Sequence, residues 1–183
     1  MDVDTAHERV LEAAETLFYS HGIQTVGMDA IRAESGVSLK RLYQCFPAKN
    51  TLVAAYLHRR DARWRRDLSD FVAAHPTPAP RVLAVFDFLD RWFASPDFRG
   101  CAFINALGEL GGTSEEVRLA ARDHKQRLHA QVDTWLREDG ITAANAASHL
   151  LLLIDGAIVS AATGLNPHAA QQARAVAATL LPL

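Results

Sequence analysis

Apolar residues recur along this chain at the spacing of an α-helix. The first stripe fills positions i, i+3, i+4, i+7 and i+8 with Val10, Ala13, Ala14, Leu17 and Phe18. This spacing predicts an amphipathic helix over residues 5–20, with Thr5 and Glu8 forming a capping box at its start. Alternating apolar and polar residues nowhere persist for the length of a strand. The predicted fold class is therefore all-α.

Two short helices, separated by a tight turn, are predicted next. The first begins at Thr25 or Gly27 and continues through Met28. Gly36 ends it, because glycine readily adopts the left-handed conformation that such a turn requires. The second begins after Ser38, whose hydroxyl suits a helix N-cap.

The second short helix has an inner and an outer face. Leu42 and Phe46 are four residues apart and lie on the inner face. Pro47 ends the helix, since an interior proline removes a hydrogen bond and clashes with the preceding turn. The polar and aromatic side chains of this helix therefore point away from the core.

The remainder of the chain is also predicted to be helical. A long helix covers residues 49–75, and three prolines in residues 76–80 end it and form a stiff connector. This connector marks a hinge or the edge of a second unit. Beyond it, helices are predicted over residues 81–94, 102–110, 114–138, 143–164 and 167–180.

The composition fits a globular protein and excludes several other classes. Of the 183 residues, 49% are hydrophobic and 22% are charged, unlike a disordered tail or a collagen-like repeat. The two cysteines, at positions 45 and 101, form no metal-binding motif with each other or with histidines. We expect no metal, no cofactor and a reducing compartment.

The chain shows no feature of an exported or membrane protein. Its acidic N-terminus lacks the basic and then apolar order of a signal peptide. The most apolar stretch, residues 143–165, contains Asn145, His149 and Asp155, which are costly at the centre of a bilayer. We expect a soluble cytoplasmic protein with no membrane partner.

Charge is distributed unevenly along the chain. The net charge of the whole chain is −2, yet residues 26–66 contain nine basic and three acidic side chains, which gives +6 there and −8 elsewhere. Such asymmetry indicates one end that binds a polyanion. Five arginines at positions 59–66 add to this charge, and they suit either a solvated helix face or a DNA contact.

The two short helices have the arrangement of a helix-turn-helix. The major groove of DNA, about 12 Å wide, admits one helix whose outward side chains reach base edges. Lys40 or Arg41 would donate to guanine, Gln44 would pair with adenine, Leu39 would pack on a thymine methyl, and Tyr43 would reach a phosphate or a base. Surface lysines and arginines also occur on short helices of other helical proteins, so this pattern alone leaves both interpretations open.

A wider set of positions resembles the N-terminal DNA-binding domain of the TetR/AcrR family of bacterial transcriptional regulators. The resemblance covers residues 8–57 and rests on Val10-Leu11-Glu12-Ala13-Ala14, Leu17-Phe18, Gly22, Ile31, Ser35-Gly36-Val37-Ser38, Leu42-Tyr43, Phe46-Pro47-Ala48-Lys49 and Leu52. It implies a helix-turn-helix domain over residues 1–48, joined by a long helix to a ligand-binding and dimerisation domain over residues 49–183. It also implies a homodimeric repressor that binds a palindromic operator of double-stranded DNA and leaves it when a small-molecule effector binds.

Several positions depart from the family pattern. Val26 and Gly27 stand where a Thr or Ser usually precedes the second helix, although Gly27 still offers backbone donors. Cys45 replaces a residue that contacts phosphate, and Ala48 replaces a serine cap. Our predicted DNA-binding residues are Thr25, Gly27, Met28, Ser38, Leu39, Lys40, Arg41, Tyr43, Gln44 and Lys49.

Aromatic side chains at helical spacing follow the proline-rich segment. Such stripes commonly form a core, but the resemblance implies a ligand cavity among these helices. Cys101 suits either a redox or electrophile sensor or a small buried hydrophobe. The predicted ligand-binding residues are Phe86, Leu89, Trp92, Phe93, Cys101, Phe103, Ile104, Asn105, His124 and Leu128.

The predicted helix over residues 143–164 is apolar on nearly all sides and must be buried on more than one of them. Small residues recur in it every four positions, which allows another backbone to approach closely. Together with the alanine-rich last helix it would form a four-helix dimer interface, or else it is a core helix of one protomer. The predicted interface residues are Leu152, Gly156, Val159, Ser160, Gly164, Ala173, Ala177 and Leu180.

An enzyme and an adaptor protein are the two other functional classes to consider. The sequence lacks the short motifs of zinc proteases, serine hydrolases, nucleotide-binding enzymes and di-iron bundles, so we assign no catalytic residue and expect no enzyme. The alternative is a helical ligand-binding or adaptor protein whose DNA-binding unit has decayed, as Val26, Cys45 and Ala48 would suggest.

Overall fold

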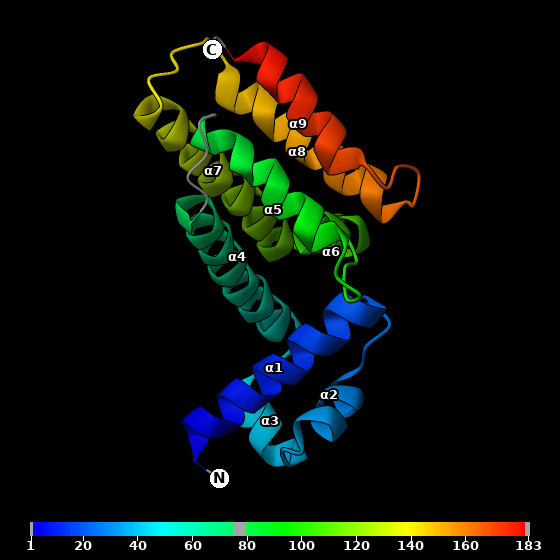
Figure 1. Cartoon of the computed structure of the whole chain (residues 1–183). Helices are drawn as coiled ribbons and strands as arrows, with labels where there is room; N and C mark the ends of the chain where they lie inside the picture. The colour runs from blue at the N-terminus through cyan, green and yellow to red at the C-terminus, as the bar shows by residue number, and fades with distance from the viewer. Residues whose placement is uncertain (1, 75–79, 182–183) are drawn as a thin grey trace. The chain divides into compact units, whose positions relative to one another are not determined.

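The computed structural model describes residues 2–74 and 80–181 (Figure 1), and within them the chain forms nine α-helices, one short 3-10 helix and no strand. The predicted all-α class is confirmed. The elements in chain order are α1 (Val3–His21), α2 (Met28–Ser35), α3 (Leu39–Cys45), α4 (Lys49–Ala74), η1 (Arg81–Leu83), α5 (Ala84–Phe93), α6 (Ala102–Leu110), α7 (Glu115–Glu138), α8 (Ala146–Ala162) and α9 (Ala169–Leu180).

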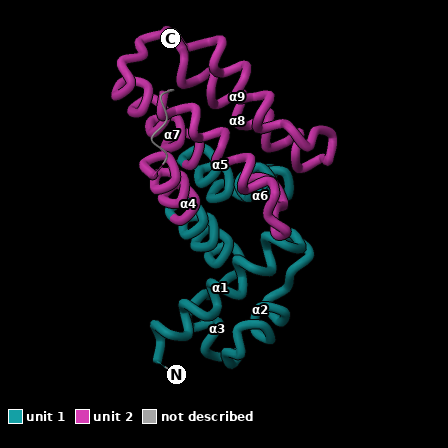
Figure 2. Tube along the Cα trace, viewed as in Figure 1, with its two compact units in different colours: residues 1–62, 102–123 teal, residues 63–101, 124–183 magenta. Residues whose placement is uncertain are grey.

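The chain divides into two compact units (Figure 2). Unit 1 contains residues 1–62 and 102–123, and unit 2 contains residues 63–101 and 124–183. Both α4 and α7 begin in unit 1 and end in unit 2. The domain division after residue 48 stays a prediction.

In unit 1, α1 packs against α2 and α3. The contacts bury Val10, Ala14 and Ile31 completely and leave Phe18 only 3% exposed. Val10, Ala14 and Phe18 belong to the stripe that the helical periodicity places on the inner face of α1. Burial of this stripe is the main stabilising contribution, because each large apolar side chain removed from water contributes about 1.5–3 kcal/mol.

The start of α1 differs from the prediction. Asp2 is the N-cap, and its carboxylate accepts hydrogen bonds from the backbone N–H and the hydroxyl of Thr5 at 2.8 and 2.7 Å. These two hydrogen bonds lower the pKa of Asp2 below its ordinary value. The capping box predicted for Thr5 and Glu8 is wrong, because the helix begins two residues earlier than the apolar stripe suggests.

The turn and the caps of the two short helices are as predicted. Gly36 ends α2 in the left-handed conformation with φ of 63°. Ser38 is the N-cap of α3, and its hydroxyl accepts the backbone N–H of Arg41 at 3.4 Å. The helix ends at Cys45, before Pro47. The ends of these two helices and the turn between them could therefore be predicted from the sequence.

In unit 2, helices α5, α8 and α9 pack together. The proline-rich connector lies outside the described residues except for Pro80, which precedes η1. Helix α8 begins three residues later than predicted, after Asn145, and ends at Ala162. Gly164 therefore lies in a left-handed turn beyond the helix, and its predicted place in a helical stripe of small residues is wrong.

Residues 2–74 and 80–181 contain neither a membrane-spanning helix nor a cluster of metal-binding side chains. No helix there is long and apolar enough to cross a membrane. No group of three or more His, Cys, Asp or Glu side chains in the same ranges is arranged to hold a metal ion.

Candidate nucleic-acid interface

Helix α3 has one buried side chain and a broad exposed face. Leu42 is completely buried and fixes the inner face of the helix. Leu39 and Tyr43 are 46% and 45% exposed, and Lys40 and Gln44 are also exposed. Leu39 and Tyr43 form an apolar pair at i, i+4 spacing, and Lys40 and Gln44 form a polar pair beside it. A single helix with such a face fits into a major groove.

The turn before α3 disfavours a side chain at position 36, because its backbone has a φ of 63° and the end of the Arg9 side chain lies close by. A Cβ atom on Gly36 would lie 2.9 Å from Nη2 of Arg9. Ser35 is buried, and its hydroxyl accepts the N–H of Val37 at 3.4 Å. The angle between α2 and α3 is thus set by the left-handed glycine and by buried contacts on both sides of it.

The start of α2 exposes backbone donors. Gly27 is the N-cap and provides no side-chain hydrogen bond, and no atom lies within 4 Å of the place its Cβ would occupy. Thr25 is exposed and Met28 is half-buried, whereas Val26 is only 5% exposed. Val26 is thus a core residue, and the open N-terminus of α2 suits a phosphate contact.

Lys49 lies in a different environment from the other predicted DNA-binding residues. It is half-buried, with Nζ 5.9 Å from the centre of the Phe18 ring. Burial lowers the pKa of Lys49, and the carboxylate of Glu109 partly offsets this effect. Its ammonium group therefore interacts with Phe18 and Glu109 of unit 1, and its contact with DNA stays a prediction.

Glu109 on α6 holds the loop between α1 and α2, and the sequence analysis missed it. Its Oε1 accepts the backbone N–H of Ile23 at 3.0 Å, and its Oε2 accepts that of Gln24 at 2.7 Å. The side-chain amide of Gln24 also donates to the backbone carbonyl of Glu109. A carboxylate that accepts two N–H groups forms strong, charge-assisted bonds. This contact joins α6 to the helix-turn-helix within unit 1.

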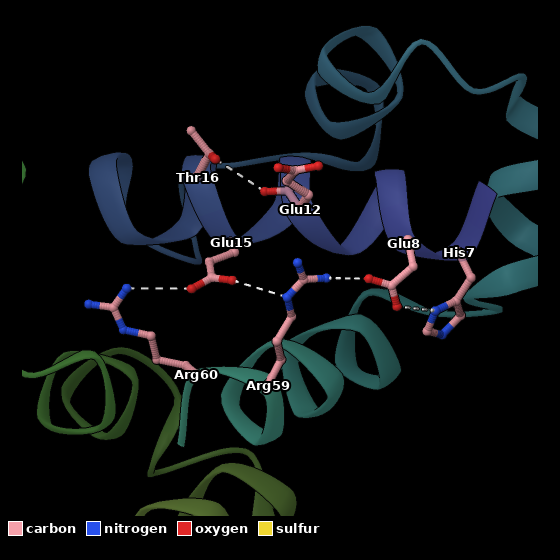
Figure 3. A network of polar contacts seen from close by, with 7 residues as sticks. All are labelled: His7, Glu8, Glu12, Glu15, Thr16, Arg59 and Arg60. Atoms are coloured by element: carbon pink, nitrogen blue, oxygen red, sulfur yellow. Dashed lines mark hydrogen bonds and ion pairs between the residues drawn. The ribbon is translucent and has the colours of Figure 1, made fainter. Parts of the chain in front are cut away.

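The arginine run begins with two residues that pair with α1 (Figure 3). Arg59 lies 2.8 Å from Glu8 and 3.5 Å from Glu15, and Arg60 lies 3.4 Å from Glu15. Arg60 also lies over the ring of Tyr19, 4.2 Å from its centre. These two arginines thus attach α4 to α1, a role that neither expectation for the run included.

The predicted ligand-binding residues lie in both units. In unit 2, Phe86, Leu89, Cys101, His124 and Leu128 are buried, and Trp92 and Phe93 are half-buried. In unit 1, Phe103 is buried, Ile104 is half-buried and Asn105 is exposed. The ligand site stays a prediction.

Two hollows are described in the structure. One, of about 420 Å³, lies in unit 2 beside the end of α7, the following loop and the start of α8. The other, of about 270 Å³, lies in unit 1 between α1 and α2. None of the ten predicted ligand-binding residues lines either hollow.

The predicted interface residues fall into three groups by exposure, and Gly164 belongs to the exposed group. Leu152, Gly156, Val159 and Leu180 are exposed, Leu152 to 72%. Ser160 is half-buried, while Ala173 and Ala177 are buried inside the protomer. Asp155, a carboxylate in this apolar helix, forms an ion pair with Lys125 on α7. The exposed group remains available to a partner chain.

Comparison with known proteins agrees with this geometry. The family described as "Bacterial regulatory proteins, tetR family" matches residues 10–56, which span α2 and α3. A crystal structure of a TetR-family transcriptional regulator from Streptomyces coelicolor is 31% identical and superimposes with a TM-score of 0.83. That alignment covers 97% of this chain and 94% of the other.

Other relatives are similar over smaller parts or at lower identity. An HTH-type transcriptional regulator of Mycobacterium tuberculosis is 35% identical over 122 residues, which are 64% of this chain and 60% of that protein. The match therefore spans less than two thirds of the relative's length. A tetR-type regulator from Streptomyces avermitilis is 28% identical, with a TM-score of 0.78 over 94% of this chain and 98% of the other.

Proposed function

The chain belongs to the TetR family of bacterial transcriptional regulators, and we propose that it represses transcription in the cytoplasm as a homodimer that binds a palindromic DNA operator and leaves it when a small molecule binds. This family consists of regulators and not of enzymes. The observation that carries the proposal is the exposed face of α3 around a completely buried Leu42.

The chemistry of this face suits base recognition. Lys40 and Gln44 offer donors and an acceptor, while Leu39 and Tyr43 offer apolar surface of the kind that contacts a thymine methyl. The exposed N-terminus of α2 at Gly27 supports binding of an adjacent phosphate. Two copies of α3 would occupy successive major grooves about 34–36 Å apart.

The exposed apolar residues of α8 and α9 support the homodimer. Leu152, Val159, Val176 and Leu180 are each at least 47% exposed. Apolar side chains gathered on two adjacent helices mark an interaction surface. A second copy of the chain would bury them in the proposed four-helix interface.

Release by an effector requires that the effector bind the DNA-free form more tightly. Each 1.4 kcal/mol of this preference weakens operator affinity tenfold. Helices α4 and α7 both run through unit 1 and unit 2, so they are the continuous elements through which binding in unit 2 would act. In unit 1, Glu109 would carry a shift of α6 to the loop before α2.

The test is selection of bound duplexes from a random pool by the full chain, followed by a salt titration. We expect a symmetric half-site and affinity that falls steeply with salt, because phosphate contacts release counterions. Lys40→Ala with Gln44→Ala should abolish the selection. Arg122→Ala with Gln126→Ala, a matched exposed pair on α7, should leave it unchanged. No complex at low salt would support the adaptor alternative instead.

A further inference from the structure

The indole of Trp64 on α4 is surrounded by other aromatic rings of unit 2. Its ring centre lies 5.5 Å from that of Phe88, 5.7 Å from that of Trp92 and 5.7 Å from that of His124, each pair packed edge to face. Trp64 is only 8% exposed. These contacts draw on α4, α5 and α7, so three elements fix the orientation of the ring.

The N–H group of this indole is buried without an acceptor among residues 2–74 and 80–181. A buried indole N–H in a folded protein usually finds a hydrogen-bond acceptor. None of the three neighbouring rings, that of His124 included, accepts this N–H, and an N–H directed at a ring face gains only a weak interaction. The donor of Trp64 is therefore suited to an acceptor that the described residues do not supply.

The phenylalanine and tryptophan rings that extend the cluster beyond Trp64 are more exposed than Trp64 itself. Phe71 packs on Phe88 with ring centres 5.6 Å apart, and Phe98 packs on Trp92 at 5.0 Å and on Phe93 at 4.9 Å. All five of these residues are half-buried, in contrast to Trp64. The cluster thus has a buried donor at its centre and aromatic surface at its rim.

We propose that this cluster binds a flat, uncharged aromatic molecule whose ring nitrogen or carbonyl oxygen accepts a hydrogen bond from Nε1 of Trp64. The rim would stack on the faces of the ligand, and the indole N–H would select for the acceptor. A cation would gain from the ring faces but would leave the N–H unpaired. The inference rests on the proposed function, since this ligand would be the effector.

The test uses three probes of the same shape and the full-length chain. Naphthalene has no acceptor, quinoline has a ring-nitrogen acceptor, and N-methylquinolinium has a positive charge and no acceptor. The chain contains three tryptophans, so a nitrogen-15-labelled sample gives three indole N–H signals in an NMR titration. We expect quinoline to shift the Trp64 signal and to bind about tenfold more tightly than the other two, the effect of one hydrogen bond.

Variants identify the donor. Trp64→Phe keeps a ring but removes the N–H, and it should abolish the preference for quinoline. Trp135→Phe, a matched change at a buried tryptophan outside the cluster, should retain it. If Trp64→Phe does not fold, the comparison of the three probes on the unaltered chain decides alone. Equal binding of quinoline and naphthalene, or tighter binding of N-methylquinolinium, would overturn the proposal.

Operator binding by the same samples separates this inference from the proposed function. A chain that selects a symmetric operator but does not prefer quinoline contradicts the ligand class alone. A chain that forms no DNA complex at low salt contradicts the proposed function, whatever it does with the probes.

Discussion

The carboxylate of Glu109 accepts the backbone N–H of Gln24, although 85 positions separate the two residues in the chain. Through this bond a helix that follows the long α4 in sequence holds the loop directly before α2. The loop before α2 is thus held by a residue far outside the segment that the family pattern matches, residues 10–56.

Glu109→Ala should lower the stability of unit 1 and weaken operator binding. It leaves the N–H groups of Ile23 and Gln24 without their acceptor, and hydrogen bonds to a charged group contribute about 1.5–3 kcal/mol. Chemical denaturation and DNA titration measure the two effects. Glu109→Gln keeps one acceptor oxygen, so its stability and operator affinity should lie between those of Glu109→Ala and the unaltered chain. Unchanged operator affinity in Glu109→Ala would show that this contact does not position the helices.

Leu42→Ala should destabilise the chain by about 2–5 kcal/mol, because it removes the buried side chain that anchors α3. Leu39→Ala changes the same residue type on the exposed face and should alter stability by about 0.5 kcal/mol or less. Urea denaturation of both variants gives the comparison. Equal stabilities would mean that α3 is not anchored through Leu42.

Lys40→Ala and Arg41→Ala should each reduce operator affinity by about 1–3 kcal/mol and relax the base preference at one position of the half-site. Competition among single-base variants of the selected operator measures this. A uniform loss across all operators, with a shallower dependence on salt, would assign these side chains to phosphates and not to bases.

Leu152→Asp should yield a folded monomer. The side chain is 72% exposed in the protomer, so the charge affects folding little but is costly in an apolar dimer interface. Leu119→Asp makes the same change at an exposed leucine on α7 and should leave the dimer intact. Sedimentation of the two proteins decides, and a dimeric Leu152→Asp protein would place the interface elsewhere.

Asp2→Asn should lower the stability of the fold at neutral pH but not at acidic pH. The pKa of Asp2 in the folded chain lies below the ordinary 3.8, because the ionised carboxylate accepts the hydrogen bonds of Thr5. Its ionised form therefore stabilises the fold above 3.8, and this contribution is lost as the pH falls through the lowered pKa. In thermal melts, the unaltered chain should have a higher melting temperature than Asp2→Asn at neutral pH. The two melting temperatures should become equal at a pH below the lowered pKa of Asp2. A constant difference would contradict the cap.

Local features of the chain could be predicted from the sequence because they depend on neighbouring residues. Gly36 and Ser38 occupy the predicted turn and cap, and Leu42 is the predicted inner anchor. The start of α1 was missed because Asp2 precedes the apolar stripe by several residues. Gly164 was misplaced because an alanine-rich pattern does not show where a helix ends.

The contacts that join separate elements could not be predicted from spacing. Nothing near Glu109 in the sequence points to Ile23 or Gln24, since the bonds are to backbone groups that every residue carries. In the sequence, Arg59 and Arg60 belong to a run of arginines that suits a solvated helix face. Their ion pairs with Glu15 form only because the fold packs α4 against α1. A buried donor such as that of Trp64 likewise appears only once its neighbours are placed.

The chain passes from one unit to the other three times. Two of these crossings lie within a helix, after Ala62 in α4 and after Asp123 in α7. No single cut in the gene can therefore separate unit 1 from unit 2. A clone that stops after residue 62 would encode the recognition helix yet omit α6, and the loop at Ile23 and Gln24 would lose the carboxylate that holds it. The unit that we propose reads the operator is encoded by two separate stretches, residues 1–62 and 102–123, and substitutions in the second stretch are expected to weaken DNA binding as substitutions in the first do.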